Sequence, residues 1–327
     1  MTSKERVIAA ITFGRPDRIP TDVWCVPSVY LRYGSKVDDL IEKYPIDFAR
    51  PKWDRSKMDP RCEAGTYEDE WGVVWDNGDN EGYVAMPHVH PLADLNKVDT
   101  YKLPFDRMPA IVDSSDIAKE PDKFWIGLGA EFFHRICWLR GVENVMMDLM
   151  YESAKQLKLR DMLLDYFMRQ VKAQMDAGVD GVYFSDDFGT QRQLLIPPRL
   201  WRSFVKPVYK ELFDACKKAG KLVCFHSDGY IVEIIEDLIE IGVDLLNCQV
   251  WCMGPKMLGK KFGGRIAFWG ELNRQETLPH GTPDDIRKCA AEMKRDLATE
   301  KGGLIGQGEI DGLTRFENIE ALLSVWY

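Results

Sequence analysis

The segment Leu222–Gly229 reads LVCFHSDG. Its first four residues are apolar and suit a buried strand, and its last four are small or polar, as at a strand end. Before it, Pro198 to Ala219 has helical spacing and ends at Gly220, a typical C-cap. After it, Ile231 to Ile241 predicts a second helix, which Gly242 stops. The segment is therefore the strand of a repeated strand–helix unit.

The same unit recurs along the chain. Further strands are expected at 19–24, 123–128, 182–185, 244–247, 266–269 and 303–306, and further helices at 142–150, 157–177 and 282–300. Alternating strands and helices give a parallel sheet with right-handed crossovers. The chain has no GxGxxG loop and no Walker A motif, which favours a closed barrel over a nucleotide-binding sheet. We therefore expect an α/β fold, a (β/α)8 TIM barrel, with residues 1–327 as a single domain.

Residues 50–108 do not follow this pattern, because they are rich in Asp, Pro, Gly and aromatic residues. They contain a hairpin pattern, with strands expected at Trp71–Trp75 and Gly82–Met86 and a turn at Asp76–Asp79. We interpret them as an irregular N-terminal insertion near the barrel mouth, not as a separate domain.

Composition excludes several classes of protein. The net charge of -9 leaves no basic patch for a phosphate backbone, so we expect no nucleic-acid partner. No apolar run reaches the roughly 18 residues that span a bilayer, so we expect no membrane partner. The eight cysteines are scattered, which fits reduced thiols and a cytoplasmic location better than a disulfide framework.

Polar residues gather where the predicted strands end, and the active site of such a barrel lies at those ends. The residues selected in this way are Asp186, Asp187, His226, Asp228, Gln249, Glu271, Gln307 and Glu309. Crowded acids raise one another's pKa unless a cation lies among them. A metal ion, a cationic substrate or a role in proton transfer would each explain the crowding.

His226 and Asp228 are the most specific pair, because residues i and i+2 of a strand point the same way. Imidazole and carboxylate together suit zinc, although both side chains could instead bond to backbone at the barrel rim. Of Asp186 and Asp187, one is expected to face the mouth and the other to cap the turn at 189–191. Glu271 either faces inward or pairs with Arg274.

The remaining candidates are less specific. His134 either overhangs the mouth or simply begins a helix, and Trp269 and Tyr230 are expected in the core or in a pocket wall. His88 and His90 form an HxH pair, but their loop-like context argues against a metal site.

Several segments resemble the uroporphyrinogen decarboxylase (URO-D) superfamily over nearly the whole chain and in the same order. These are Thr2–Val7, Arg15–Pro20, Leu139–Asn144, Gly178–Gln191, Phe225–Gly229, Leu238–Asp244, Leu278–Pro283 and Phe316–Ile319. The resemblance implies a (β/α)8 barrel, independently of the strand pattern. It also implies a homodimer, since members of the family tend to form dimers.

The superfamily has two main chemistries. True decarboxylases carry the segment RQAGRY after the first strand, whereas Val26–Gly34 reads VPSVYLRYG here, which argues against porphyrinogen as the substrate. Corrinoid-dependent methyltransferases form the other branch, and some bind zinc through His-x-Cys and a cysteine on the last strand. His226 matches that histidine, but Asp228 replaces the first cysteine and Gly306–Glu309 contains none. A harder site suits an oxygen-bearing substrate better than a thiol.

The resemblance therefore implies an enzyme, a methyltransferase that moves a methyl group from an O-methyl (methoxy-aromatic) or related donor to the corrinoid of a partner protein. This chain shows no corrinoid-binding motif. The expected catalytic residues are Asp186, Asp187, His226, Asp228 and Glu271; the expected substrate-binding residues are Gln191, His134, Gln249, Trp269 and Tyr230; and the expected zinc ligands are His226, Asp228 and Glu309. The alternatives are a cofactor-free decarboxylase or lyase of another carboxylated substrate, and a binding protein on a degenerate barrel.

Overall fold

The fold is an eight-stranded parallel barrel, seen in a computed structural model that describes residues 1–50, 58–108, 112–151 and 153–327. The strands follow one another around the barrel in chain order: β1 (Thr21–Cys25), β2 (Phe48–Ala49), β6 (Phe124–Leu128), β7 (Gly181–Ser185), β8 (Leu222–Ser227), β9 (Leu245–Cys248), β10 (Ala267–Glu271) and β11 (Leu304–Ile310). β11 pairs with β1, and the backbone N–H of Asp47 beside β2 donates to Thr21 at 2.8 Å, which nearly closes the ring. The prediction of a (β/α)8 TIM barrel is confirmed.

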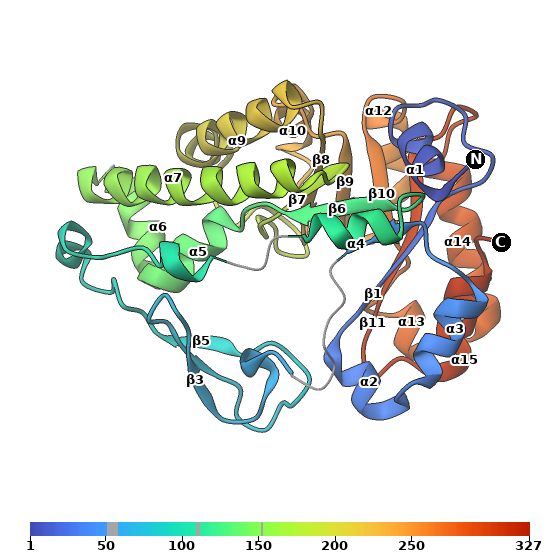
Figure 1. The fold of residues 1–327 in the computed structure, drawn as a ribbon, viewed down its shortest axis with the longest axis horizontal. Helices are drawn as coiled ribbons and strands as arrows, with labels where there is room; N and C mark the ends of the chain where they lie inside the picture. The colour runs from blue at the N-terminus through green and yellow to red at the C-terminus, as the bar shows by residue number, and fades with distance from the viewer. Residues whose placement is uncertain (51–57, 109–111, 152) are drawn as a thin grey trace.

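Helices surround the barrel (Figure 1). They are α1 (Ser3–Ile11), α2 (Pro27–Tyr33), α3 (Lys36–Lys43), α4 (Ser114–Lys119), α5 (Phe132–Arg140), α6 (Val142–Tyr151), α7 (Ala154–Ala177), α8 (Pro198–Leu200), α9 (Lys206–Lys218), α10 (Ile235–Glu240), α11 (Val250–Met253), α12 (Pro255–Phe262), α13 (Thr277–His280), α14 (Pro283–Leu297) and α15 (Phe316–Ser324). A π-helical turn, Trp201–Val205, joins α8 to α9, so the long helix expected there is interrupted. None of the described helices has the length and apolarity needed to cross a bilayer.

The barrel interior is filled by aromatic and aliphatic side chains. Phe48 from β2 stacks on Trp269 from β10, with ring centres 4.9 Å apart, and meets Phe124 of β6 edge-on. Val7 and Ile11 of α1 belong to the same buried cluster. Because α1 and these rings fill the barrel below the mouth, its polar chemistry is confined to the C-terminal ends of the strands.

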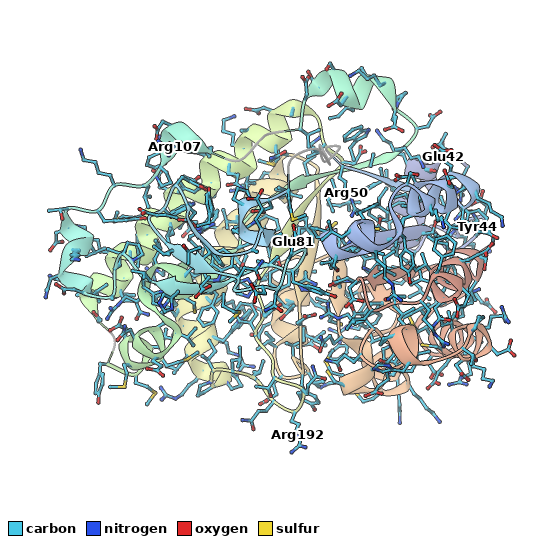
Figure 2. The ribbon with its side chains drawn as sticks, turned by 90° about the horizontal axis from the view of Figure 1, so that it is seen from below. Glu42, Tyr44, Arg50, Glu81, Arg107 and Arg192 are labelled. Atoms are coloured by element: carbon cyan, nitrogen blue, oxygen red, sulfur yellow. The ribbon has the colours of Figure 1, made fainter. Side chains whose placement is uncertain are left out.

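The insertion between β2 and β6 carries a three-stranded antiparallel sheet, β3 (Thr66–Glu68), β4 (Val74–Asp76) and β5 (Met86–Val89). Short 3-10 helices flank it at Pro60–Cys62, Leu95–Asp99 and Phe105–Arg107. Figure 2 shows this side of the molecule, with Glu81 of the β4–β5 connection near the middle of the view. An insertion near the mouth is confirmed.

The hairpin within the insertion lies later in the sequence than expected, because its strands are β4 and β5 and not Trp71–Trp75 and Gly82–Met86. Asp69 explains the difference, because its carboxylate accepts hydrogen bonds from the backbone of Trp71 and Val73 at 3.0 and 2.9 Å. Those bonds turn the chain where the first strand was expected. Pairing therefore begins later, at Val74, and a third strand joins before Trp71.

Candidate active site at the barrel mouth

Three side chains converge at the ends of β7 and β8. One ligand atom from each of Asp187, His226 and Asp228 lies within 4.8 Å of the others, and we call these residues the Asp–His–Asp cluster. The His226 Nε2 atom is 3.4 Å from the Asp187 carboxylate and 3.6 Å from that of Asp228. The strand register explains the meeting, because His226 is level with Ser185 and each aspartate follows by two residues. The structure thus brings His226 and Asp228 together, as expected, and adds Asp187.

The His226 ring is held in one orientation. Its Nδ1 atom bonds to the Asn247 side-chain oxygen on β9, and the Asn247 amide donates to the backbone of Trp269 at 2.7 Å. The Trp24 ring lies against the imidazole at 5.5 Å. Burial by itself lowers the pKa of His226. The two cluster aspartates and Asn247 outweigh this effect and raise the pKa to about 10. The ring therefore directs Nε2 at the two carboxylates.

The donor set of the Asp–His–Asp cluster fits a divalent cation such as zinc. Catalytic zinc sites use three protein ligands, commonly imidazole with carboxylate, and leave one position open. The Asp228 Oδ1 atom is buried and has no hydrogen-bond partner in the described part of the chain. Asn247, bonded to the other nitrogen of the imidazole, is the kind of second partner that orients a metal-binding histidine.

Arg274 lies among the remaining acids of the mouth. Its guanidinium bonds to Asp228, lies 2.8 Å from Glu309 and is 3.5 Å from Glu271. Glu309, expected to be a ligand beside His226, is paired with this arginine instead, and Asp187 takes the expected place. The physical reason is position in the barrel: β11 is separated from β8 by two strands, whereas β7 is its neighbour.

Glu271 ends β10 as a buried acid. Its Oε2 atom has no hydrogen-bond partner among the described residues, and Arg274 approaches only the other oxygen. Burial raises the pKa of Glu271, and the charges of Asp228 and Glu309 add to the rise. Arg274 offsets only part of it, so the pKa is about 8. An acid with a pKa raised in this way is mostly protonated at neutral pH and is chemically able to donate a proton.

The raised pKa of Glu271 predicts a pH-dependent stability. Because the folded-state pKa lies above the ordinary value, stability is full at low pH and is lost as pH rises from about 4.5 through about 8. We expect Glu271→Gln to change stability by less than about 1 kcal/mol at pH 5 and to add about 4 kcal/mol at pH 8.5. Thermal melts at the two pH values measure this, with the exposed Glu143→Gln as the matched control. An equal effect of Glu271→Gln at both pH values would contradict the assignment.

Asp186, expected among the catalytic residues, is completely buried and faces α5. Its carboxylate accepts hydrogen bonds from the backbone of Phe133 and His134, at 2.6 and 2.7 Å, and from the Tyr209 hydroxyl. Burial raises its pKa to about 6, although the nearby His134 and these donors lower it. The expectation that one aspartate faces the mouth holds for Asp187, but the other caps the first turn of α5, not the turn at 189–191.

Removing the Asp186 carboxylate should therefore cost stability. Asp186→Ala leaves two backbone donors and one hydroxyl without their acceptor, and we expect a loss of about 2 kcal/mol in the free energy of unfolding. Urea denaturation measures the loss. The control is Asp165→Ala, which breaks an exposed ion pair with Arg169 and should cost less than about 0.5 kcal/mol. Equal costs for the two variants would exclude the capping role.

His134 of α5 lies behind the cluster and contacts both aspartates of β7. Its ring nitrogens are 3.6 Å from Asp186 and 3.5 Å from Asp187, and the ring stacks on Trp138. Burial lowers the pKa of His134, but the hydrogen bond with Asp187 and the charge of Asp186 raise it to about 9. The His134 Nε2 atom also accepts a hydrogen bond from the Asp187 backbone N–H at 3.1 Å, so His134 positions Asp187.

The other residues expected to bind substrate lie at different depths. The Gln249 side-chain oxygen accepts hydrogen bonds from Gln191 at 2.6 Å and from the Gly229 backbone at 3.2 Å, which ties the loops after β7, β8 and β9 together. Tyr230 is half-buried beside them. Trp269 lies inside the barrel, stacked on Phe48.

A buried acid on β1 was not among the expected residues. Asp22 is fully buried, accepts a hydrogen bond from Trp24 at 2.9 Å and bonds to Arg50 at 2.6 Å. Arg50 is labelled near the centre of Figure 2. Asp22 belongs to the segment expected as the first strand, so its position in the barrel was available from the sequence.

A cavity of about 440 Å³ opens beside the cluster, under the insertion. Its walls come from the ends of β6 and β7, from α5 and α7, and from the insertion: residues 59–61, 67, 69–71, 128–131, 135, 166, 167, 170, 183 and 185. Tyr183, in the wall, lies 6.4 Å from the His226 ring centre to centre. Sequence patterns did not point to this cavity, because its wall is assembled from segments more than 100 residues apart.

Comparison with known proteins identifies a family model that matches this chain and solved structures that resemble it. Residues 69–326 match the family model of uroporphyrinogen decarboxylase (URO-D). A methyltransferase from Methanosarcina mazei is similar in structure, with 17% identity and a TM-score of 0.72 over 99% of this chain and 98% of that one. A B12-independent methionine synthase from Shewanella sp. W3-18-1 aligns over 89% of this chain and 83% of its own, at 10% identity and a TM-score of 0.46.

At 17% identity the Methanosarcina mazei structure supports the fold alone, and no curated protein matches the sequence. The family model, in contrast, spans most of the chain, including the strand ends that carry the Asp–His–Asp cluster and Glu271. The chain belongs to the uroporphyrinogen decarboxylase (URO-D) family.

Proposed function

We propose that this protein is a methyltransferase that takes a methyl group from an O-methyl donor, such as a methoxy-aromatic, for the corrinoid of a partner protein. The observation that carries the proposal is the pairing, at one barrel mouth, of a hard three-ligand cluster with a buried acid, Glu271, one of whose oxygens has no hydrogen-bond partner in the described part of the chain. Demethylation of an ether needs help at the leaving oxygen, and both features supply it. A methyltransferase from Methanosarcina mazei has a similar fold, so this fold can accommodate the same class of reaction.

The chain's own residues divide the work. Asp187, His226 and Asp228 would hold a zinc ion, which would polarise the leaving oxygen as a Lewis acid. When the C–O bond breaks, the oxygen keeps the bonding electrons, and the methyl group would pass to the reduced corrinoid of the partner protein, which would supply the electron pair of the new bond. Glu271 gives its proton to that oxygen, so the product is neutral, and the carboxylate regains a proton from solvent. Arg274 neutralises Asp228 and Glu309 through its ion pairs, which limits the repulsion that these carboxylates exert on Glu271 while it is ionised.

The assay is formation of methylcobalamin from free cob(I)alamin and a panel of methoxy-aromatic donors, with and without added zinc. We expect zinc-dependent transfer from at least one donor. Absence of transfer from the whole panel, with zinc bound, would argue against the proposal. The eight cysteines, all in the described part of the chain, form no disulfide, which agrees with the cytoplasmic location that we propose.

Release of CO2 is the second reaction to measure, because the matching family model is that of a decarboxylase. A cofactor-free decarboxylase would act on carboxylated substrates without metal, and its activity would survive chelation. Metal-independent CO2 release with no methyl transfer would favour that alternative.

A further inference from the structure

The cavity beside the Asp–His–Asp cluster contains a buried guanidinium whose donors are not used. The Arg135 Cζ atom lies between two indoles, 4.2 Å from the Trp71 ring centre and 4.7 Å from that of Trp138. Its Nε and Nη1 atoms are buried and make no hydrogen bond within the described residues. The carboxylate that forms an ion pair with Arg135 is that of Asp69, whose Oδ2 atom lies 3.6 Å from Nη1. A buried charged donor without an acceptor is costly, so this arrangement calls for an anion.

Two neutral groups in the same wall are also unpartnered. The Tyr166 hydroxyl and the Gln170 side-chain oxygen are buried and have no hydrogen-bond partner in the part of the chain that the structure describes. Both residues come from α7, and Tyr166 packs edge-on against Trp71, with ring centres 4.6 Å apart. The cavity therefore offers several unused polar groups around Arg135, and aromatic surface beside them.

The charges of Glu131, Asp69 and Glu70 in the cavity wall act on Arg135, but none of these carboxylates accepts a hydrogen bond from its buried Nε or Nη1 atom. Asp59 is paired with Arg61 at 2.8 Å. Asp69 already accepts three hydrogen bonds from its own turn and from Trp75, at 2.9 to 3.0 Å. Glu70 and Glu131 are exposed, and so lie at the rim in contact with water.

We propose that this cavity binds the carboxylate of the methyl donor, with Arg135 as the anchor. This inference rests on the function proposed above. A guanidinium fixed between two rings presents its donors in the planar fork that matches a carboxylate. The volume of the cavity falls within the range of small-molecule pockets, and aromatic rings from the insertion, β7 and α7 line the cavity. The inferred substrate class is a small methylated carboxylic acid, with an aromatic acid as the best fit.

The position of the cavity connects this anchor to the reacting end. Arg135 directly follows His134, which contacts Asp187, so neighbouring residues of α5 serve the cavity and the cluster. Tyr183 lines the cavity and lies against His226. A donor held by its carboxylate at Arg135 extends along β7 toward the cluster.

Binding is measured by calorimetry on the purified protein without any corrinoid, using 4-methoxybenzoate and its neutral amide, 4-methoxybenzamide. We expect the acid to bind about tenfold more tightly than the amide, because only the acid pairs with a guanidinium. Arg135→Gln should abolish this preference, and Arg135→Lys should retain part of it. Tyr166→Phe, which removes one hydroxyl without opening a cavity, should weaken acid binding about threefold and leave Tm unchanged.

The matched control is Arg169→Gln, which removes an exposed arginine stacked on Phe105 and should not change binding. Equal affinity for acid and amide, or a preference for the acid that survives in folded Arg135→Gln, would overturn the inference. Glycine betaine in place of the aromatic acid separates an N-methylated from an aromatic donor, and either result retains the carboxylate anchor. Tight Arg135-dependent binding without methyl transfer would contradict the proposed function alone. Methyl transfer from a neutral donor, unaffected by Arg135→Gln, would contradict the anchor alone.

Discussion

Replacing Arg274 by methionine is expected to lower the free energy of unfolding by about 3–5 kcal/mol at pH 8. The guanidinium is the cation shared by Asp228, Glu271 and Glu309. Methionine fills a similar space but leaves three clustered acids without it. The cost of removing one partner from a buried ion pair is mostly that of the charges left behind, and here several are left. Urea denaturation of the variant and the parent protein measures the effect.

The pH dependence of this loss identifies its cause. Arg274 lowers the pKa values of Glu271 and Glu309, so without it these folded-state pKa values rise, and stability is retained at low pH and lost as pH increases. We expect the destabilisation to shrink toward pH 4.5, where protonation removes the repulsion. The control is Arg265→Met, which breaks an exposed pair with Glu236 and should cost at most about 1 kcal/mol. A loss that does not vary with pH would instead indicate lost packing around the side chain.

Replacing His226 by alanine is expected to lower methyl transfer at least about a hundredfold and to remove bound zinc. His226 is the nitrogen donor of the Asp–His–Asp cluster, and without it only the two carboxylates that follow β7 and β8 remain. Metal content of the purified protein and single-turnover transfer to cob(I)alamin measure the two effects separately. His226→Ala also opens space beside Trp24, so circular dichroism must show that the fold is retained.

The matched control for His226 is His88→Ala, an exposed histidine of β5 that lies outside the cluster. It should retain both zinc and activity. If His226→Ala kept stoichiometric zinc, the metal would be bound elsewhere and the cluster would have only a proton-transfer role. If it lost zinc but kept full activity, the metal would not take part in the reaction.

The barrel could be predicted from local patterns because each strand–helix unit carries its own signals. Leu222–Gly229 has an apolar run and a polar end, and Thr282 caps α14 through a capping box with Asp285, ahead of Pro283 at the first turn. Spacing also placed His226 and Asp228 on one side of β8. Within the insertion, local signals were weaker, because the Asp69 turn competes with strand pairing at Trp71.

The site was only partly predictable, because its members meet through the closure of the barrel. Being an acid at a strand end does not distinguish Asp187, which faces His226, from Asp186, which caps α5. The pairing of Glu309 with Arg274 depends on which strands are neighbours across the mouth.

By itself the sequence determined the order of strands and helices, the strand that presents His226 and Asp228, and the acidic character of the mouth. The physical reason is that periodicity, caps and strand ends act over a few residues. Only the tertiary structure decided that Asp187 joins the cluster, that Arg274 neutralises the other acids and that Glu271 is kept protonated. Only the tertiary structure, too, placed Arg135 without an acceptor in a cavity under the insertion. Burial and charge at these positions are set by residues distant in the chain, so no local pattern records them.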